Sequence, residues 1–241
     1  MARSKHLPLY PANLDLYGWP VLVVGGGEVA WRKAEMLLEC GAKVTMVAPE
    51  LSPRPPAMKV KSAKVLRRRF RLSDLKSMRM VFAATDDAEL NRRIAEEGCK
   101  RGLLVNVASP PWAGNFQVPA TVRRGPLCIA FSTGGASCAL ARSLRQLFER
   151  HIGAEWGQLA ELLESRRPTV LAQVTNPAVR RKLLQALGSA AWARRVKQLG
   201  PEAAAREMDA CIASSANGAA EGKIRGGLRS HRAAFGGERK R

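Results

Sequence analysis

Short apolar runs alternate with amphipathic segments over the first half of the chain. The runs are bounded by glycine, proline or polar residues, as is typical of strands buried on both faces of a parallel sheet. They lie at residues 21–24, 44–47, 63–70, 78–85 and 103–109. Between them, residues 28–40 and 87–102 have apolar side chains at helical spacing, and we expect Ala88, Leu90, Ile94 and Ala95 to face inward. This alternation predicts an α/β fold with an open, Rossmann-type parallel sheet and right-handed crossovers.

The pattern changes after Pro111. Two apolar runs within residues 115–133 are separated by Arg123-Arg124-Gly125-Pro126, which predicts a β-hairpin rather than another crossover. The next segments have the spacing of amphipathic helices, with Ser137 as the first N-cap, and lie at residues 137–152, 155–174 and 176–199. From about residue 213, small and charged residues without an apolar period predict a disordered tail.

The segment GGGEVA at residues 25–30 fits the pattern G-x-G-x-x-[GA] between an expected strand and an expected helix. Gly25 would permit the tight turn, Gly27 would let the backbone approach a pyrophosphate, and Ala30 would allow close packing of helix and strand. The helix N-terminus would offer N–H groups to the phosphates. A purely structural turn is the alternative, and the flanking strands favour a dinucleotide site.

Residues after two later strands extend this candidate site. Glu50, next to Pro49, lies about 20 residues beyond the glycines, where a carboxylate would bind the adenosine ribose. No arginine directly follows the second strand, so the 2′-phosphate of NADP would have no obvious partner there. The sequence therefore favours NAD over NADP. Thr85 and Asp86 end the AATDD run at the carboxyl end of another strand, so we interpret them as cofactor-binding residues. Capping of the next helix by Asp86 or Asp87 is the alternative.

A second glycine element, FSTGGAS at residues 131–137, precedes an expected helix. Its N–H groups and hydroxyls, together with the helix dipole, could form an anion-binding nest. An ordinary N-cap is the alternative.

Composition argues against some classes of protein but does not select one function. The net charge of +20 suits nucleic acid, a polyanionic small molecule or solubility alone, and one basic block contains Arg67–Arg69. Five cysteines without C-x-x-C spacing disfavour a disulfide framework or a zinc site, and we expect buried free thiols in a reducing cytoplasm. We expect no membrane span and no secretory signal, because long apolar runs are absent.

Three motifs occur in a specific order: GGGEVAWRK at 25–33, AATDD at 83–87 and STGGASCALAR at 132–142. Residues 6–210 resemble the precorrin-2 dehydrogenase family, found as the N-terminal module of siroheme synthase and as stand-alone dehydrogenases or dehydrogenase/ferrochelatases. The resemblance implies a cytoplasmic homodimer that uses NAD to oxidise precorrin-2 to sirohydrochlorin, with no nucleic acid, membrane or resident metal. The carboxylate fringe of the tetrapyrrole would then account for the basic surface.

The resemblance also implies a domain order and a set of contacts. An NAD-binding Rossmann-type domain at 1–114 would precede a dimerisation region at 115–150, a helical domain at 151–212 and the tail at 213–241. Glu28, Val29, Pro49 and Glu50 would contact NAD. The tetrapyrrole would contact Asn106, Asn115, Ser132, Thr133 and Ser137.

One departure from the family concerns catalysis. Ser109 stands where relatives usually have an aspartate, in the loop after Asn106-Val107. A hydroxyl is not a base near neutral pH, whereas metal insertion requires removal of pyrrole protons. We therefore expect oxidation to be retained and iron insertion to be weak, unless Glu155, Glu161 or Glu164 replaces the aspartate. The alternatives are a bifunctional dehydrogenase–ferrochelatase and a non-catalytic sensor of NAD and tetrapyrrole or nucleic acid.

Overall fold

The computed structural model describes residues 9–53 and 63–216. The chain divides into two compact units. The first contains the chain up to Pro119 together with Ser132–Cys138, and the second contains Ala120–Phe131 and the chain from Ala139 onward. The division into domains predicted from the sequence stays a prediction.

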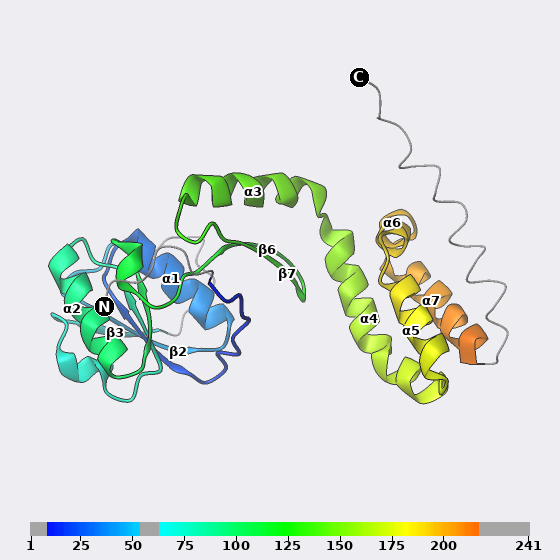
Figure 1. Ribbon diagram of the computed structural model, residues 1–241, viewed down its shortest axis with the longest axis horizontal. Helices are drawn as coiled ribbons and strands as arrows, with labels where there is room; N and C mark the ends of the chain where they lie inside the picture. Colours follow the sequence, from blue (N-terminus) through cyan, green and yellow to red (C-terminus); the bar gives the residue numbers. More distant parts are fainter. Residues whose placement is uncertain (1–8, 54–62, 217–241) are drawn as a thin grey trace, which may run out of the picture. The chain divides into compact units, whose positions relative to one another are not determined.

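The first unit contains a five-stranded parallel sheet in the order β3-β2-β1-β4-β5 (Figure 1). Its strands are β1 (Pro20–Val24), β2 (Lys43–Ala48), β3 (Lys64–Arg67), β4 (Met80–Ala83) and β5 (Leu104–Val107). Its helices are α1 (Glu28–Glu39) and α2 (Ala88–Lys100), with 3₁₀ turns η1 (Leu72–Leu75) and η2 (Pro111–Ala113). The order reverses between β1 and β4, which places a ligand crevice at the carboxyl ends of these strands. The predicted α/β fold class is confirmed.

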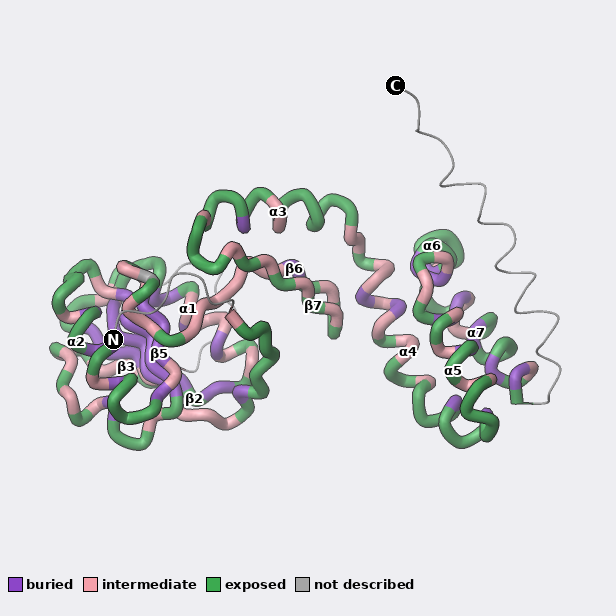
Figure 2. Tube along the Cα trace, in the orientation of Figure 1, coloured by how far each residue is buried: buried purple, intermediate pink, exposed green. Residues whose placement is uncertain are grey.

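The sheet is buried on both faces, as the apolar runs predicted. Val21 and Val23 of β1 pack in the cluster that contains the inner side of α1, whereas Leu22 and Val24 pack in the cluster that contains α2. Figure 2 shows the strands as the most continuously buried part of this unit. Burial on both faces leaves no polar positions within β1, which explains why its sequence does not alternate.

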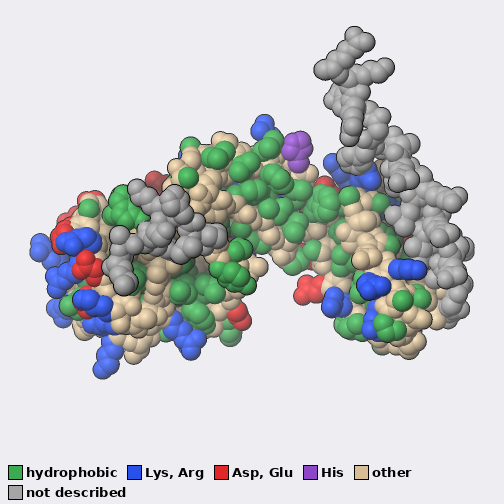
Figure 3. All heavy atoms as spheres, viewed as in Figure 1, with side chains coloured by type: hydrophobic (Ala, Val, Ile, Leu, Met, Phe, Trp, Pro, Cys, Tyr) green, Lys and Arg blue, Asp and Glu red, His purple; other side chains and the backbone are tan. Residues whose placement is uncertain are grey.

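The second unit begins with the predicted hairpin, formed by β6 (Ala120–Arg124) and β7 (Leu127–Phe131). Its helices are α3 (Cys138–His151, from Ala139 in this unit), α4 (Ala154–Gln173), α5 (Pro177–Leu187), α6 (Ala190–Leu199) and α7 (Pro201–Ala216). The last four helices enclose a core of their own. By contrast, α3 buries only Ala141 fully, and Figure 3 shows hydrophobic side chains gathered over α3 and the hairpin.

Four expectations at this level require correction. The helix predicted over 176–199 is broken at Gly188 and Ser189, which cap α5 and α6. Ala88 is exposed rather than inward-facing. The five cysteines are free as expected, but four are exposed and Cys40 is half-buried. Of the predicted tail, residues 213–216 belong to α7, and the remainder lies outside the described residues.

None of the described helices is both long and apolar enough to span a membrane.

Candidate functional site

The glycine turn between β1 and α1 is shaped by two neighbouring loops. Gly25 has a φ of 130°, which side chains rarely adopt, and a Cβ there would collide with the carbonyl oxygen of Ala84. A Cβ at Gly26 would collide with the carbonyl oxygen of Glu50. The packing of the protein itself therefore requires glycine at both positions.

Gly27 meets no such requirement. Its φ of −80° and ψ of 179° suit any residue, and a Cβ there would have no heavy atom within 4 Å. Gly27 is the N-cap of α1 and makes no side-chain cap, while Glu28 and Val29 are exposed in the first turn. The first N–H groups of such a helix have no partner within the helix. The open space and the uncapped N-terminus together fit the pyrophosphate of a dinucleotide.

The segment after β2 is fastened to this turn. The backbone N–H and the hydroxyl of Ser52 both donate to the Gly26 carbonyl oxygen at 2.9 Å, and the Trp31 indole donates to the Ser52 carbonyl oxygen at 3.1 Å. Pro49 and Glu50 precede this anchor and are exposed at the carboxyl end of β2. The predicted ribose carboxylate is therefore held beside the glycine turn.

Asn91 of α2 organises the loops after β4 and β5. Its side-chain oxygen accepts from the Thr85 hydroxyl at 2.8 Å and from the Thr85 N–H at 3.3 Å. Its side-chain nitrogen donates to the carbonyl oxygens of Thr85 at 2.9 Å and Ser109 at 3.3 Å. Asp87 caps α2 by accepting from the Leu90 N–H, whereas Asp86 is exposed beside it. The capping alternative thus holds for Asp87.

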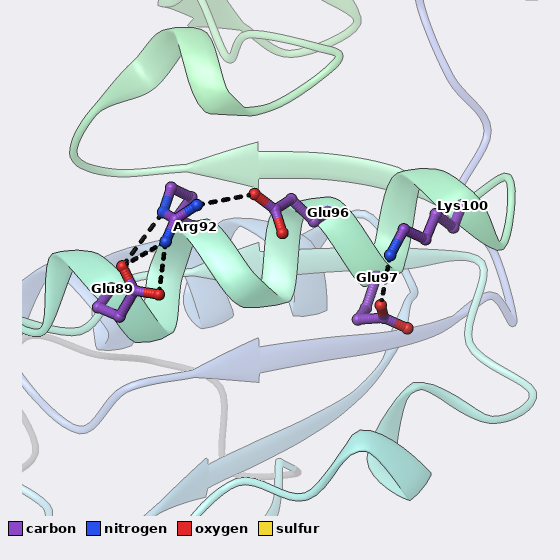
Figure 4. Close-up of polar contacts among 5 residues, drawn as sticks. All are labelled: Glu89, Arg92, Glu96, Glu97 and Lys100. Carbon is purple, nitrogen blue, oxygen red and sulfur yellow. Dashed lines mark hydrogen bonds and ion pairs between the residues drawn. The ribbon is translucent and has the colours of Figure 1, made fainter.

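Sequence reasoning missed Asn91, although its spacing could have revealed it. Asn91 lies three and four residues before the buried Ile94 and Ala95, and it is itself only 1% exposed. A buried amide at such a position needs partners, and two loop ends supply them. The outer side of the same helix carries exposed ion pairs of Arg92 with Glu89 and Glu96, and of Lys100 with Glu97 (Figure 4).

Lys33 of α1 is held against β5, on the face of the sheet opposite to α2. The Lys33 ammonium donates to the Asn106 side-chain oxygen at 2.8 Å and lies 5.1 Å from the centre of the Phe82 ring. The Asn106 side-chain nitrogen donates to the Phe116 carbonyl oxygen at 3.2 Å. Burial, with a smaller effect of Arg32, lowers the pKa of Lys33 to about 8. Both polar ends of Asn106 are thereby committed to the protein.

The loop after β5 is fixed at both of its ends. The Ala108 N–H donates to the Ala83 carbonyl oxygen at 2.8 Å. The Asn115 side chain pairs with β5 like an added strand, since it accepts from the Val105 N–H at 2.7 Å and donates to the Leu103 carbonyl oxygen at 2.8 Å. Ser109 lies between these anchors and is exposed. The contacts give Asn115 a structural role, and its predicted contact with a substrate stays a prediction.

The second glycine element belongs to the same unit. Gly134 and Gly135 have φ values of 63° and 92°, and the Gly134 N–H donates to the Ser132 hydroxyl at 3.2 Å. The Thr133 hydroxyl accepts from the Ser137 N–H at 3.0 Å and lies 3.1 Å from the Ser137 carbonyl oxygen, to which it donates. Because these hydroxyls already serve the turn, anion binding by this element stays a prediction.

The parts of this arrangement are suited to binding and positioning a ligand. The glycine turn and the ends of β2, β4 and β5 meet at one edge of the sheet. Within the described part of the chain, no group of three His, Cys, Asp or Glu side chains could hold a metal ion. Residues 98–148 contain neither aspartate nor glutamate, so this stretch supplies no carboxylate base beside Ser109.

Two family descriptions match consecutive parts of the chain. Residues 12–120 match a domain described as "Putative NAD(P)-binding", and residues 124–151 match "Sirohaem biosynthesis protein central".

Curated relatives and a solved structure agree with these matches. A siroheme synthase of Chromobacterium violaceum is 40% identical over 210 residues, which cover 86% of this chain and 44% of that protein. A siroheme synthase of Ectopseudomonas mendocina is 43% identical over 159 residues, which cover 66% and 33%. The chain thus spans less than half the length of these relatives. The structure of SirC, a precorrin-2 dehydrogenase, superposes with a TM-score of 0.67 at 27% identity, covering 83% of this chain and 99% of SirC. The chain belongs to the family formed by the N-terminal module of siroheme synthases and by SirC.

Proposed function

We propose that the protein is an NAD-dependent dehydrogenase that oxidises precorrin-2 to sirohydrochlorin. The observation that carries the cofactor assignment is Gly27, a glycine that neither backbone conformation nor packing requires, at an uncapped helix N-terminus. The similarity to SirC and to siroheme synthases supports the choice of substrate. Bound NAD supplies the acceptor for the hydride that leaves the macrocycle.

The chain's own residues bind and orient the reactants. The N–H groups around Gly27 and Glu28 would hold the pyrophosphate, and the Glu50 carboxylate would accept hydrogen bonds from the ribose hydroxyls. Thr85, fixed by Asn91, and Asp86 border the nicotinamide half of the crevice. The excess of basic residues attracts the carboxylates of the tetrapyrrole. A proton would leave with the hydride, and the Ser109 hydroxyl, which is no base near neutral pH, would not accept it.

The same proposal includes the assembly and the location. A hairpin such as β6–β7 gains stability when a further partner packs on it. The exposed apolar residues of α3 support packing against a second copy about a two-fold axis. The proposed location of this homodimer is the cytoplasm, and the proposed function in siroheme synthesis supports it.

The direct test is anaerobic incubation of the purified protein with precorrin-2 and NAD, followed by absorbance. We expect NADH to form in proportion to sirohydrochlorin. Binding of NAD and tetrapyrrole with no NADH formed would instead support the sensor. A nucleic-acid sensor would also shift DNA in a gel with a steep dependence on salt.

Iron insertion is the second candidate activity, and Ser109 argues against it. A carboxylate there could accept pyrrole protons and attract Fe²⁺, whereas serine offers neither charge nor basicity. Wild type and Ser109→Asp should be given sirohydrochlorin and Fe²⁺ without oxygen. We expect both proteins to oxidise precorrin-2, and only the variant to insert iron above the spontaneous rate. Efficient insertion by the wild type, with no gain in the variant, would restore the bifunctional alternative and direct attention to Glu155, Glu161 and Glu164.

A further inference from the structure

The basic block at Arg67–Arg69 divides into three environments. Arg68 forms a two-pronged ion pair with Asp74, with N···O distances of 2.7 and 2.9 Å, and this contact lowers the pKa of Asp74. Arg69 is exposed beyond the end of β3. Arg67 is the last residue of β3 and is exposed, and its side chain makes no hydrogen bond or ion pair with any described residue.

Strand pairing brings Arg67 to the candidate cofactor site. Arg67 is in register with Ala48, the last residue of β2, so both lie at the same edge of the sheet. Adjacent strands are about 4.8 Å apart, which an arginine side chain spans easily. The adenosine ribose of a dinucleotide lies just beyond the end of β2 in this fold. Strand β3 therefore places an arginine at the edge of the sheet where the sequence has none directly after β2.

A cavity adjoins this position. It has a volume of about 600 Å³ and is lined by Trp31, Leu51, Ser52, Pro53, Val65 and Arg67. Binding sites for small organic molecules usually measure roughly 300–1,000 Å³, with apolar walls and a few polar groups. Among the described residues that line the cavity, Arg67 is the single cation. An apolar wall with one guanidinium beside it suits an adenosine that carries a phosphate.

Glu50, just after the end of β2, opposes the attraction of Arg67 for a phosphate. Its carboxylate suits ribose hydroxyls and repels a phosphate, whereas a guanidinium binds phosphate through paired hydrogen bonds. Resting on the proposed function, we propose that Arg67 binds the 2′-phosphate of NADP, so that the site accepts NADP as well as NAD.

The test compares two ligands that differ only in that phosphate, ADP-ribose and 2′-phospho-ADP-ribose. Isothermal titration calorimetry on the full-length chain gives both dissociation constants for wild type, Arg67→Gln and Arg69→Gln. We expect the wild type to bind both ligands. Arg67→Gln should weaken 2′-phospho-ADP-ribose about tenfold or more and change ADP-ribose less than about threefold. Arg69→Gln removes the same charge two residues away and should change both ligands equally and slightly.

Each outcome decides the proposal. Binding of ADP-ribose with rejection of its 2′-phosphorylated form would overturn the role of Arg67 and leave the proposed function intact. Equal losses in Arg67→Gln and Arg69→Gln would assign the effect to overall charge and also overturn it. Failure of both ligands to bind the wild type would overturn the proposed cofactor as well. A Glu50→Gln variant should strengthen the 2′-phosphorylated ligand selectively, and its failure to do so would contradict the assigned balance of charges.

Discussion

Three consecutive glycines meet different demands. Gly25 and Gly26 leave room for the carbonyl oxygens of two neighbouring loops, so their role is structural whether or not a ligand binds. No neighbouring atom of the protein requires a glycine at position 27, because a Cβ there would meet no heavy atom within 4 Å. A motif that matches as a single unit therefore separates, in the structure, into two residues that build the turn and one residue that the turn does not require.

Substitutions should separate these two roles. Gly27→Asp should weaken NAD by an order of magnitude or more, because a negative side chain would occupy the pyrophosphate position, while thermal stability stays near that of the wild type. Gly26→Ala should instead destabilise the fold by about 1–3 kcal/mol through overpacking against Glu50. Calorimetric titration with NAD and thermal unfolding measure the two effects. Unchanged NAD affinity in folded Gly27→Asp would refute the placement of the pyrophosphate.

Lys33 provides a prediction about pH. Its pKa is about 8 in the folded protein against an ordinary value of 10.5, so between these values the unfolded chain binds more protons than the folded chain. The free energy of unfolding of the wild type, relative to Lys33→Met, should therefore rise as the pH increases from about 8 towards 10.5. Urea unfolding at several pH values measures this difference. Lys100→Met is the control, because Lys100 is exposed and its contact with Glu97 raises its pKa. The corresponding difference for Lys100 should therefore not rise over this range and should fall slightly towards pH 10.5. A flat difference for Lys33→Met would contradict the lowered pKa of Lys33.

At the scale of helices and strands, the sequence predicts those elements that are determined by a local pattern of residues. Strands such as β1 are recognisable because burial on both faces removes polar residues, and the hairpin is recognisable from Gly125, whose φ is 54°. The break between α5 and α6 was missed because the apolar spacing continues across Gly188.

Contacts between distant segments could not be predicted in the same way. Arg67 reaches the end of β2 only through strand pairing, and Lys33 meets Asn106 across 73 positions of sequence. Asn91 joins two loops that follow different strands. The candidate site thus follows from motifs where its parts are local, and from topology where they are not.

We expect substitution of Asn91, which links α2 to two loops, to lower the free energy of unfolding more than substitution of an exposed residue on the same helix. Asn91→Ala removes the side-chain acceptor of the Thr85 N–H and the donor to the Thr85 and Ser109 carbonyl oxygens, and leaves the Thr85 hydroxyl only the Asp87 carbonyl oxygen. It should cost about 1–3 kcal/mol of unfolding free energy. Arg92→Ala on the same helix breaks only exposed ion pairs and should cost less than about 1 kcal/mol. Denaturant unfolding measures both variants. Equal costs would show that Asn91 does not hold the two loops.

At the scale of the whole molecule, α3 remains incompletely buried. Leu147 and Phe148 are 42% and 39% exposed, although the Phe148 ring packs 5.0 Å from that of Phe131 in the hairpin. Large apolar residues gathered on one surface are typical of an interface. The proposed homodimer would bury them.

Leu147→Glu should therefore dissociate the dimer, because a buried carboxylate without a partner is costly in an interface. Gln146→Glu introduces the same charge at the adjacent exposed position and should leave the dimer intact. Light scattering at micromolar concentration should give the wild type and Gln146→Glu twice the chain mass of 26.2 kDa, and Leu147→Glu that mass itself. Circular dichroism should show the same helix content in all three proteins, since Leu147 contributes little to the core of a single chain. A wild type that remains monomeric, or a Leu147→Glu protein that remains dimeric, would exclude this surface as the interface.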